Sequence, residues 1–318
     1  MKKAVVIAAL LWALGFWFSL SFGVLDSPTP EIIAGLRLPR ALLASAVGIG
    51  LSIAGVILQS LFSNPLAEPY TLGISSGASV GAVLSSVLHL SLWFGKSAST
   101  SLFAIVGAVA FGLILVLSER SRSRGTGSGS THLLLTGMML TFLGSSWIAL
   151  MIAVSDSDGI QSALFWLLGD LSRAEFQPSL LALVSAAAFA FLAYRKAEVL
   201  DLFLLGEEAA SSLGLSVQKQ RRGLLILASC LVALSVSSAG MVGFVGLMIP
   251  HFCRRITGAL HRPLIPLSAI VGAAVMVWAD LGSRLIFQPI EIPVGVITAL
   301  VGSPLFIFLI QKRSGVTS

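Results

Sequence analysis

Ten long apolar stretches follow one another along the 318 residues, separated by short polar segments. Strands of a membrane barrel would instead alternate apolar and polar side chains over about ten residues. Within a bilayer no water satisfies backbone N–H and C=O groups, so apolar runs of roughly 20 residues are expected to be helices. The pattern predicts an all-α, polytopic membrane protein with ten spans, at 4–22, 41–61, 72–92, 99–118, 133–153, 179–194, 223–240, 243–256, 264–283 and 295–311.

The composition agrees with a membrane location. Hydrophobic residues make up 56% of the chain and charged residues 11%. A soluble protein of this length could not bury so much apolar surface, whereas a bilayer solvates it. Lys2 and Lys3 resemble the start of a signal peptide, but no small-residue cleavage site follows, which favours an uncleaved first span. The longest polar stretch is only 195–222, so residues 1–318 are predicted to form a single transmembrane domain.

Lysine and arginine gather in alternate gaps between the stretches. Because cytoplasmic loops carry the excess of these residues, the richer side is predicted to be cytoplasmic, with both termini there. This distribution explains the net charge of +6 without a nucleic-acid partner. The inner set is Lys2, Lys3, Arg120, Arg122, Arg124, Arg195, Lys196, Lys219, Arg221, Arg222, Arg254, Arg255, Arg262, Lys312 and Arg313, and the outer set is Arg37, Arg40, Lys96, Arg173 and Arg284.

The sequence offers little support for metal, redox or ATP chemistry. Cys230 and Cys253 fall inside predicted spans and form no C-x-x-C pair, and the four histidines have no metal-ligand spacing. We therefore expect no bound metal. A G-x-x-x-x-G-K-[ST] phosphate loop is also absent, so any ATP would have to bind a separate protein.

A G-x-S-x-G string at 73–77 matches the nucleophile elbow of hydrolases. That motif needs a strand–turn–helix context, whereas this segment opens a predicted membrane helix. An intramembrane serine hydrolase using Ser75 or Ser76, with His251 as its base, is the corresponding alternative. The spacing of Gly73, Gly77 and Gly81 favours another interpretation: small residues on one helix face let a second backbone approach closely.

Two arginines, Arg37 and Arg40, stand on the outer side, against the general charge trend. They could extend toward lipid phosphates, or they could dock an acidic partner, because a guanidinium binds a carboxylate through two hydrogen bonds. Near the outer end of the ninth span, Asp280 and Arg284 are four residues apart. They could pair with each other, or serve a function as ionisable groups within the membrane.

The longest inner loop contains a short helix candidate. Its residues of interest are Gly206, Glu207, Glu208, Ala209, Ala210, Leu213 and Gly214, with the last glycine as a C-terminal cap. A short, rigid helix between spans can transmit force from a soluble partner. Near the C-terminus, Pro293 is expected to start the last span, and Gly295, Ala299 and Gly302 give it a small-residue face for packing.

Seven strings occur together in a characteristic order: RLPR at 37–40, NPLAEP at 64–69, LGISSGA at 72–78, GEEAASSLGLSV at 206–217, GFVGLMIPH at 243–251, HRPLIP at 261–266 and EIPVGVITALVGSP at 291–304. With them the chain resembles the permease subunits of ATP-binding-cassette importers for vitamin B12, ferric siderophores and haem, the type II, FecCD-like importers. The resemblance covers nearly the whole chain. The Glu208–Gly214 string also matches the EAA-type loop of importer permeases.

The resemblance implies ten helices per subunit and a dimer with a second permease subunit, either a homodimer or a close heterodimer. It implies two cytoplasmic ATPase subunits docked on 206–217, which would carry ATP and Mg²⁺, so that this chain is no enzyme and binds no cofactor. It further implies an external binding protein whose carboxylates meet Arg37, Arg40 and Arg284. The expected location is the bacterial inner membrane.

The hypothesis from the sequence is therefore the permease subunit of an importer that moves an iron complex or cobalamin from a binding protein into the cytoplasm. The alternative is a secondary transporter driven by an ion gradient. Such transporters usually carry ionisable residues near mid-membrane. The predicted spans are nearly free of them, which weighs against that alternative.

Overall fold

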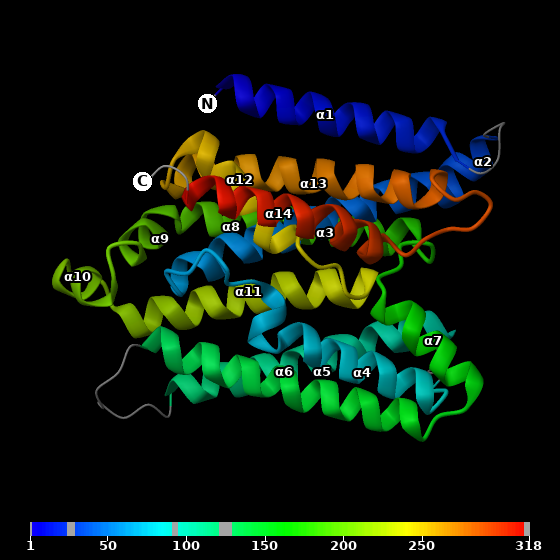
Figure 1. The fold of residues 1–318 in the computed structure, drawn as a ribbon, viewed down its shortest axis with the longest axis horizontal. Coiled ribbons are helices and arrows are strands. Elements are labelled where there is room, and N and C mark those ends of the chain that lie inside the picture. Colours follow the sequence, from blue (N-terminus) through cyan, green and yellow to red (C-terminus); the bar gives the residue numbers. More distant parts are fainter. Residues whose placement is uncertain (1, 24–28, 91–94, 121–128, 315–318) are drawn as a thin grey trace.

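The computed structural model describes residues 2–23, 29–90, 95–120 and 129–314, with side chains described for 98–118, 131–308 and the two earlier segments. Arg122 and Arg124 of the predicted inner set lie outside these residues, as do the side chains of Lys96, Arg120, Lys312 and Arg313. The described residues are helical and contain no strand (Figure 1). The elements are α1 (Lys2–Ser21), α2 (Pro30–Ile32), η1 (Ile33–Arg37), α3 (Leu38–Leu61), η2 (Pro69–Leu72), α4 (Ile74–Val87), α5 (Gly95–Arg120), α6 (Gly129–Ala153), α7 (Ser157–Leu167), α8 (Phe176–Arg195), α9 (Ala197–Phe203), α10 (Glu207–Ser212), α11 (Val217–Ala239), α12 (Val245–Thr257), α13 (His261–Leu285) and α14 (Val294–Ser314).

Each of the ten predicted spans corresponds to one helix: α1, α3, α4, α5, α6, α8, α11, α12, α13 and α14. Seven helices of the described part are long and apolar enough to cross a membrane, whereas α4 and α12 are shorter, and the side chains of α14 are described only as far as Phe308. The third span was predicted too long, mainly at its end, because α4 stops at Val87 and His89 takes a left-handed conformation (φ 47°). At its start the difference is smaller: Pro69–Leu72 forms a 3-10 turn and Gly73 is left-handed (φ 77°). Helix α7 was not predicted. Its first turn is capped by the Asp156 carboxylate, which accepts from Gly159 N–H.

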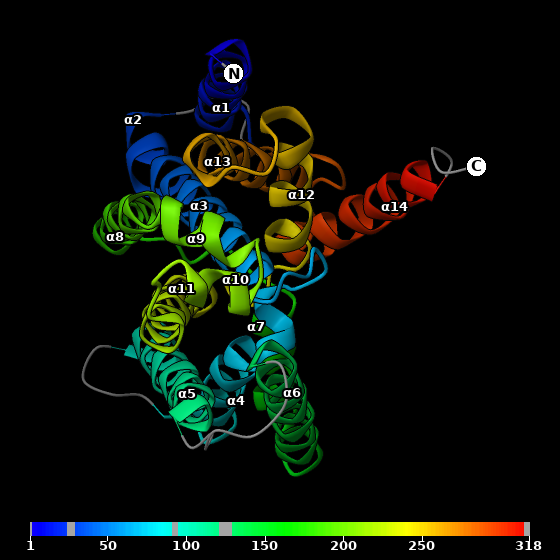
Figure 2. The same cartoon turned by 90° about the vertical axis from the view of Figure 1, so that its left-hand side faces the viewer.

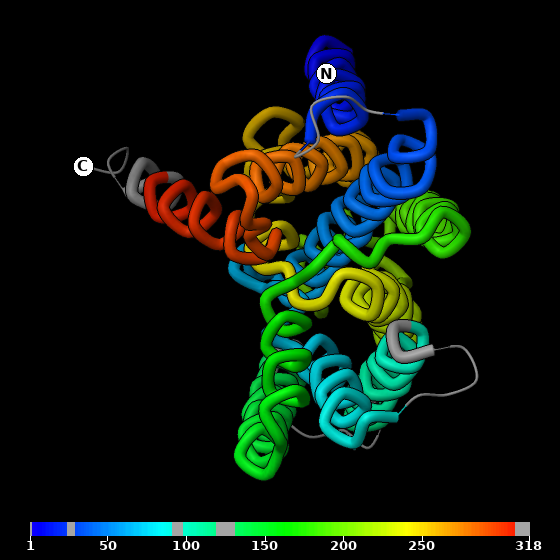
Figure 3. The backbone as a smooth tube through the Cα atoms, turned by 90° about the vertical axis from the view of Figure 1, so that its right-hand side faces the viewer, coloured from blue at the N-terminus to red at the C-terminus, as the bar shows by residue number. Residues whose placement is uncertain are grey.

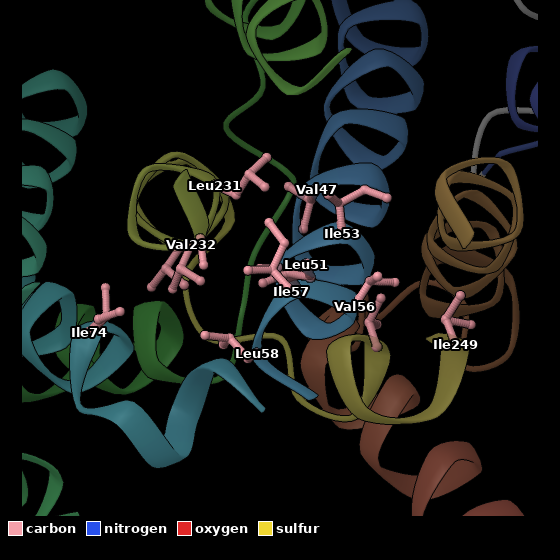
Figure 4. Packing of buried hydrophobic residues seen from close by; sticks show 14 of the residues in the cluster. Val47, Leu51, Ile53, Val56, Ile57, Leu58, Ile74, Leu231, Val232 and Ile249 are labelled. Carbon is pink, nitrogen blue, oxygen red and sulfur yellow. The ribbon is translucent and has the colours of Figure 1, made fainter. Parts of the chain in front are cut away.

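Helix α3 lies at the centre of the molecule. The views along the bundle show it surrounded by α8, α11, α12 and α13, while α1 and α6 lie at the periphery (Figures 2 and 3). Its apolar residues Val47, Leu51, Val56 and Ile57 are buried against α11 and α12 (Figure 4). The peripheral helices expose rows of apolar side chains instead. An exposed apolar surface of this kind is stable only against lipid or another protein.

Glycines let α3 touch its neighbours backbone to backbone. A Cβ built on Gly48 would lie 2.2 Å from the Gly272 carbonyl oxygen of α13. A Cβ on Gly55 would lie 1.9 Å from the Gly246 carbonyl oxygen of α12. No larger residue fits at such separations, because real Cβ atoms do not approach a carbonyl oxygen so closely. The helices around α3 are therefore held in direct backbone contact, which is how membrane helices gain packing energy without a hydrophobic effect between them.

The glycines of the α4 region divide between two neighbours rather than sharing one face. Gly77 and Gly81 lie against α5, where a Cβ would be 2.5 Å from the Gly107 carbonyl oxygen and 2.0 Å from that of Phe103, respectively. Gly73 lies against α6 instead, where its Cβ would be 2.6 Å from Leu140 Cβ. The left-handed turn at Gly73 rotates this residue off the face that Gly77 and Gly81 share.

We predict that Gly81→Ala lowers the stability of the chain in detergent by about 1–3 kcal/mol, because the added methyl group forces α4 and α5 apart. Gly223→Ala in α11 is the matched control, since nothing lies within 4 Å of the built Cβ. It should leave stability unchanged or raise it slightly, as expected of alanine in an open helical position. Thermal unfolding followed by tryptophan fluorescence measures both, and equal melting temperatures would contradict the prediction.

Candidate functional site

Five charged side chains gather at the end of the bundle where α3 begins and α13 ends: Arg37, Arg40, Asp280, Arg284 and Glu291. Arg37 is buried, and its Nη1 donates to the carbonyl oxygens of Leu20 (2.9 Å) and Ser21 (2.8 Å) at the end of α1. These carbonyls have no partner within their own helix, since they fall in its last turn. Arg37 therefore caps α1 and ties it to the start of α3.

Arg40 binds two acids at once. Its Nε donates to Asp280 Oδ1 at 2.6 Å, and its Nη1 donates to Glu291 Oε2 at 2.7 Å. Arg284 completes the cluster, with its Nη2 3.1 Å from Asp280 Oδ2 and 2.7 Å from Ser19 Oγ. Asp280 is fully buried, so it depends on both arginines for compensation. Glu291 is 39% exposed and lies on the outer rim of this cluster.

The structure thus brings together the three arginines that the sequence singled out. It also shows that Asp280 and Arg284 pair, which is one of the two alternatives their spacing left open. The arginines do not project into solvent: each is engaged inside the chain. Sequence reasoning missed Glu291 as a partner of Arg40, and no local signal could have found it, because the two residues are 251 positions apart.

The second candidate site lies at the opposite end of the bundle, where α10 stands out beyond the other helices (Figure 1). Gly206 precedes α10 at φ 92°, and Gly214 follows it at φ 86°, where a Cβ would be strained. Gly214 N–H donates to Ser211 O and Leu215 N–H donates to Ala210 O, which closes the helix with a Schellman motif. The short helix and C-terminal glycine cap that the sequence predicts are therefore present.

One buried arginine anchors α10 to the rest of the molecule. Arg221 of α11 lies 2.5 Å from Glu207 Oε1, and its guanidinium carbon lies 6.0 Å from the centre of the Phe203 ring in α9. Ala210 is fully buried against the same region. The opposite face of the helix is open: Glu208 and Ala209 are exposed, as are Leu205 and Leu213. The anchor was not foreseen, because Arg221 looked like one of many inner charges.

The predicted small-residue face of α14 packs against a loop. A Cβ on Gly295 would lie 2.4 Å from the Leu168 carbonyl oxygen and 2.6 Å from that of Met241. A Cβ on Gly302 would lie 2.7 Å from Phe244 Cβ, and Ala299 between them is half-buried. Farther along α14, the Phe306 ring packs edge-on against His251 of α12 at 5.8 Å between centroids, while the helix as a whole extends outward from the bundle (Figure 2).

The described residues contain no group of three or more His, Cys, Asp or Glu side chains that could hold a metal ion. Ser75 and Ser76 belong to the first turn of α4 and follow a 3-10 turn, so the strand that a nucleophile elbow needs is missing in this part of the chain. The Arg40 cluster at one end of the bundle and α10 at the other both carry features suited to protein contacts.

Residues 4–312 match the model of the FecCD transport family. This chain belongs to the FecCD transport family. It is 40% identical to an uncharacterised ABC transporter permease protein, YvrB of Bacillus subtilis, over 94% of this chain and 85% of the relative. It is 37% identical to the vitamin B12 import system permease protein BtuC of Vibrio cholerae, over 93% and 87%. It is 35% identical to the hemin transport system permease protein HmuU of Yersinia pestis, over 90% and 86%.

A solved structure has the same fold. An inward-facing conformation of a putative metal-chelate type ABC transporter superposes with a TM-score of 0.86 and 33% identity, covering 98% of this chain and 100% of the other. The FecCD chain is therefore an ABC-transporter permease and a multi-pass membrane protein, in agreement with the predicted bacterial inner membrane. It belongs to a family of transport subunits rather than of catalytic enzymes.

We predict that Asp280→Ala lowers the stability of this FecCD permease by about 3–5 kcal/mol, because it leaves Arg40 and Arg284 buried without their shared counter-charge. Glu291→Ala removes a partner of the same Arg40, but Glu291 is 39% exposed, so this pair should contribute at most about 1 kcal/mol. The melting temperatures of the two purified variants are compared in the same detergent. An equal drop in melting temperature for Asp280→Ala and Glu291→Ala would contradict the prediction that the buried Asp280 contributes more.

Proposed function

We propose that this chain is the membrane-spanning permease subunit of an ATP-driven importer, which moves an iron complex (siderophore or haem) or cobalamin from a binding protein into the cytoplasm. The family and the names of its relatives support the importer class and this range of cargo. The ion-gradient-driven alternative finds no support among these relatives. The observation that carries the proposal most directly is the short, anchored helix α10 at one end of the bundle.

Helix α10 suits the proposed contact with a cytoplasmic ATPase. Its C-terminal end is closed by the Schellman motif at Gly214, and its position against α11 is held by the Arg221–Glu207 ion pair. Its outer side presents Leu205 and Leu213, which are 61% and 64% exposed. Apolar side chains on a rigid polar loop are typical of a protein interface. In this proposal two ATPase subunits hold ATP and Mg²⁺, and both termini of the permease are cytoplasmic, because the start of α1 and the end of α14 lie toward the same end as α10 (Figure 1).

A second permease subunit is the proposed neighbour of α14. The end of this helix stands away from the bundle in two views (Figures 2 and 3). It exposes Leu300, Val301 and Ile307. Two copies of this chain, with a transport path along the dimer axis, would cover that surface. A rigid-body shift of the two subunits would then alternate the access of the path between the two sides.

The arginine cluster at the other end is the proposed docking site of an external binding protein. Arg37 and Arg284 are buried, so they would act by fixing the cluster and by their positive field. Arg40 is the arginine that a partner could reach, because Glu291 on its outer side is partly exposed. An incoming carboxylate would replace Glu291 at the Arg40 guanidinium. Three arginines facing two internal acids leave the cluster with an excess of positive charge that attracts an acidic partner.

The test of the function is ATP hydrolysis by a complex of this chain, co-purified in lipid with a candidate ABC ATPase and a candidate binding protein. We expect one ligand among cobalamin, haem and a panel of ferric siderophores to stimulate hydrolysis when the binding protein carries it. Leu213→Glu should reduce co-purification of the ATPase at least tenfold, since it places a charge in the proposed interface.

Ile290→Glu is the matched control, because it introduces the same charge at a 71% exposed apolar site near the opposite end. It should leave ATPase co-purification unchanged. Assembly with no ATPase at all would refute the proposed function, and equal loss in both variants would refute the role of α10.

We predict that Glu291→Gln strengthens binding of the external binding protein about fivefold, because it weakens the internal competitor for Arg40. Asp170→Asn is the control, since it weakens the exposed Arg173–Asp170 pair in the α7–α8 connection. Affinity is measured with the permease in nanodiscs and the binding protein in solution. A weaker or unchanged affinity in Glu291→Gln would contradict the exchange, because a purely structural role of Glu291 cannot raise it.

A further inference from the structure

Three elements distant in sequence meet at one buried imidazole. His261 is the first residue of α13 and is fully buried. Its Nδ1 lies 2.6 Å from Asp201 Oδ1 in α9, and its backbone N–H donates to the same oxygen at 2.9 Å. Its Nε2 lies 2.5 Å from Ser60 Oγ in the last turn of α3. The His261 relay, formed by Ser60, His261 and Asp201, therefore connects α3, α13 and α9 through consecutive hydrogen bonds.

The order of groups is that of a Ser–His–Asp triad, but the setting excludes a nucleophile. Ser60 and His261 are both fully buried, so no substrate can reach the hydroxyl. Ser60 Oγ also donates to the Val56 carbonyl oxygen at 2.8 Å, so the single hydroxyl proton is divided between that carbonyl and the imidazole. The relay is a closed hydrogen-bond network. Such a network holds its members in fixed positions, because a buried group that loses its partner bears the full cost of desolvation.

The relay joins α9, which leads into α10, to α3 and α13 through consecutive hydrogen bonds, whereas α10 itself is held to α11 by the Arg221–Glu207 pair. Asp201 lies on α9, and only three residues separate the end of α9 from the start of α10. One other ion pair joins the same two helices, between Glu198 of α9 and Arg262 of α13 at 2.8 Å. Both side chains of that pair are largely exposed, so water and salt weaken it. A displacement of α9 must therefore move His261 or break its hydrogen bonds.

Helices α3 and α13 are joined along their whole length. Ser60 and His261 join them at the end near α10. Gly48 and Gly272 place their backbones in contact midway. Arg40 and Asp280 join them at the far end, at 2.6 Å. Helices connected at three levels in this way respond to a force as one body, because packed interfaces shift between discrete arrangements rather than deforming continuously.

We propose that His261 is a positioning residue for transport: the His261 relay passes the displacement of α9 and α10 to the joined pair α3–α13, and so to the Arg40 cluster at the opposite end. This inference rests on the proposed function, in which α10 contacts the ATPase and the Arg40 cluster receives the binding protein. In this scheme the hydrogen bonds of the His261 relay connect the two sites. Contacts at either site, α10 or the Arg40 cluster, would change the position of the joined pair α3–α13.

The first experiment compares Asp201→Ala with Glu198→Ala in the permease co-purified with its ATPase in nanodiscs. Asp201→Ala should retain ATPase assembly and basal hydrolysis, but lose at least fivefold in the stimulation caused by cargo-loaded binding protein. Glu198→Ala removes the exposed pair between the same helices and should behave like the wild type. Asp201→Asn, which keeps an acceptor for the Nδ1–H donor, should restore part of the stimulation. Full stimulation in Asp201→Ala would overturn the proposal.

A second measurement needs no partner and separates this inference from the proposed function. Amide hydrogen exchange of the permease alone in nanodiscs should accelerate in Asp201→Ala at the adjoining ends of α3 and α13 as well as in α9. Acceleration confined to α9 would overturn the relay. If the wild-type chain assembles with no ATPase, the proposed function fails while the exchange data still decide whether the relay joins the three helices. A loss of stimulation that merely follows a lower melting temperature, equal in Asp201→Asn, would also overturn the proposal.

Discussion

Buried polar side chains that pin α3 to its neighbours at both ends are the constraint on which the rest of this structure depends. Within the bilayer no water is present to hydrogen-bond to a charged or polar side chain, so such a group is stable only when it is paired inside the protein. Arg40 finds Asp280 at one end of α3, and Ser60 finds His261 at the other. Between these two ends, the backbones of α3 and α13 are in direct contact at Gly48 and Gly272.

This constraint separates a rigid centre from a variable periphery. Helices α3, α11 and α13 are largely buried and joined by specific contacts, whereas α1, α5, α6, α8 and the described part of α14 expose apolar residues to their surroundings. Lipid or a second subunit can cover those surfaces without specific hydrogen bonds. The polar contacts are concentrated where protein partners are proposed, at α10 and at the Arg40 cluster, and the His261 relay stands between the first of these sites and the membrane helices.

The hydrophobic pattern predicted the ten principal helices because the length of an apolar run reflects the thickness of the bilayer. It failed at the end of α4, which stops at Val87 before a left-handed His89, and at α7, which is too short to register as a span. Local chemistry also predicted α10 and its glycine cap, since the capping hydrogen bonds involve residues only a few positions apart. The pairing of Asp280 with Arg284 was accessible for the same reason.

By itself the sequence determined the membrane class, the helices, the family resemblance and the identity of the three clustered arginines, because these depend on local composition and on motifs. Only the tertiary structure decided what those arginines touch: Arg40 meets Asp280 and Glu291 across more than 200 positions, and Arg37 turns back to cap α1. It alone brought Ser60, Asp201 and His261 together and divided the α4 glycines between two neighbours. Such contacts arise from how helices pack around α3, and helix packing depends on the shapes of all the faces at once rather than on any one segment.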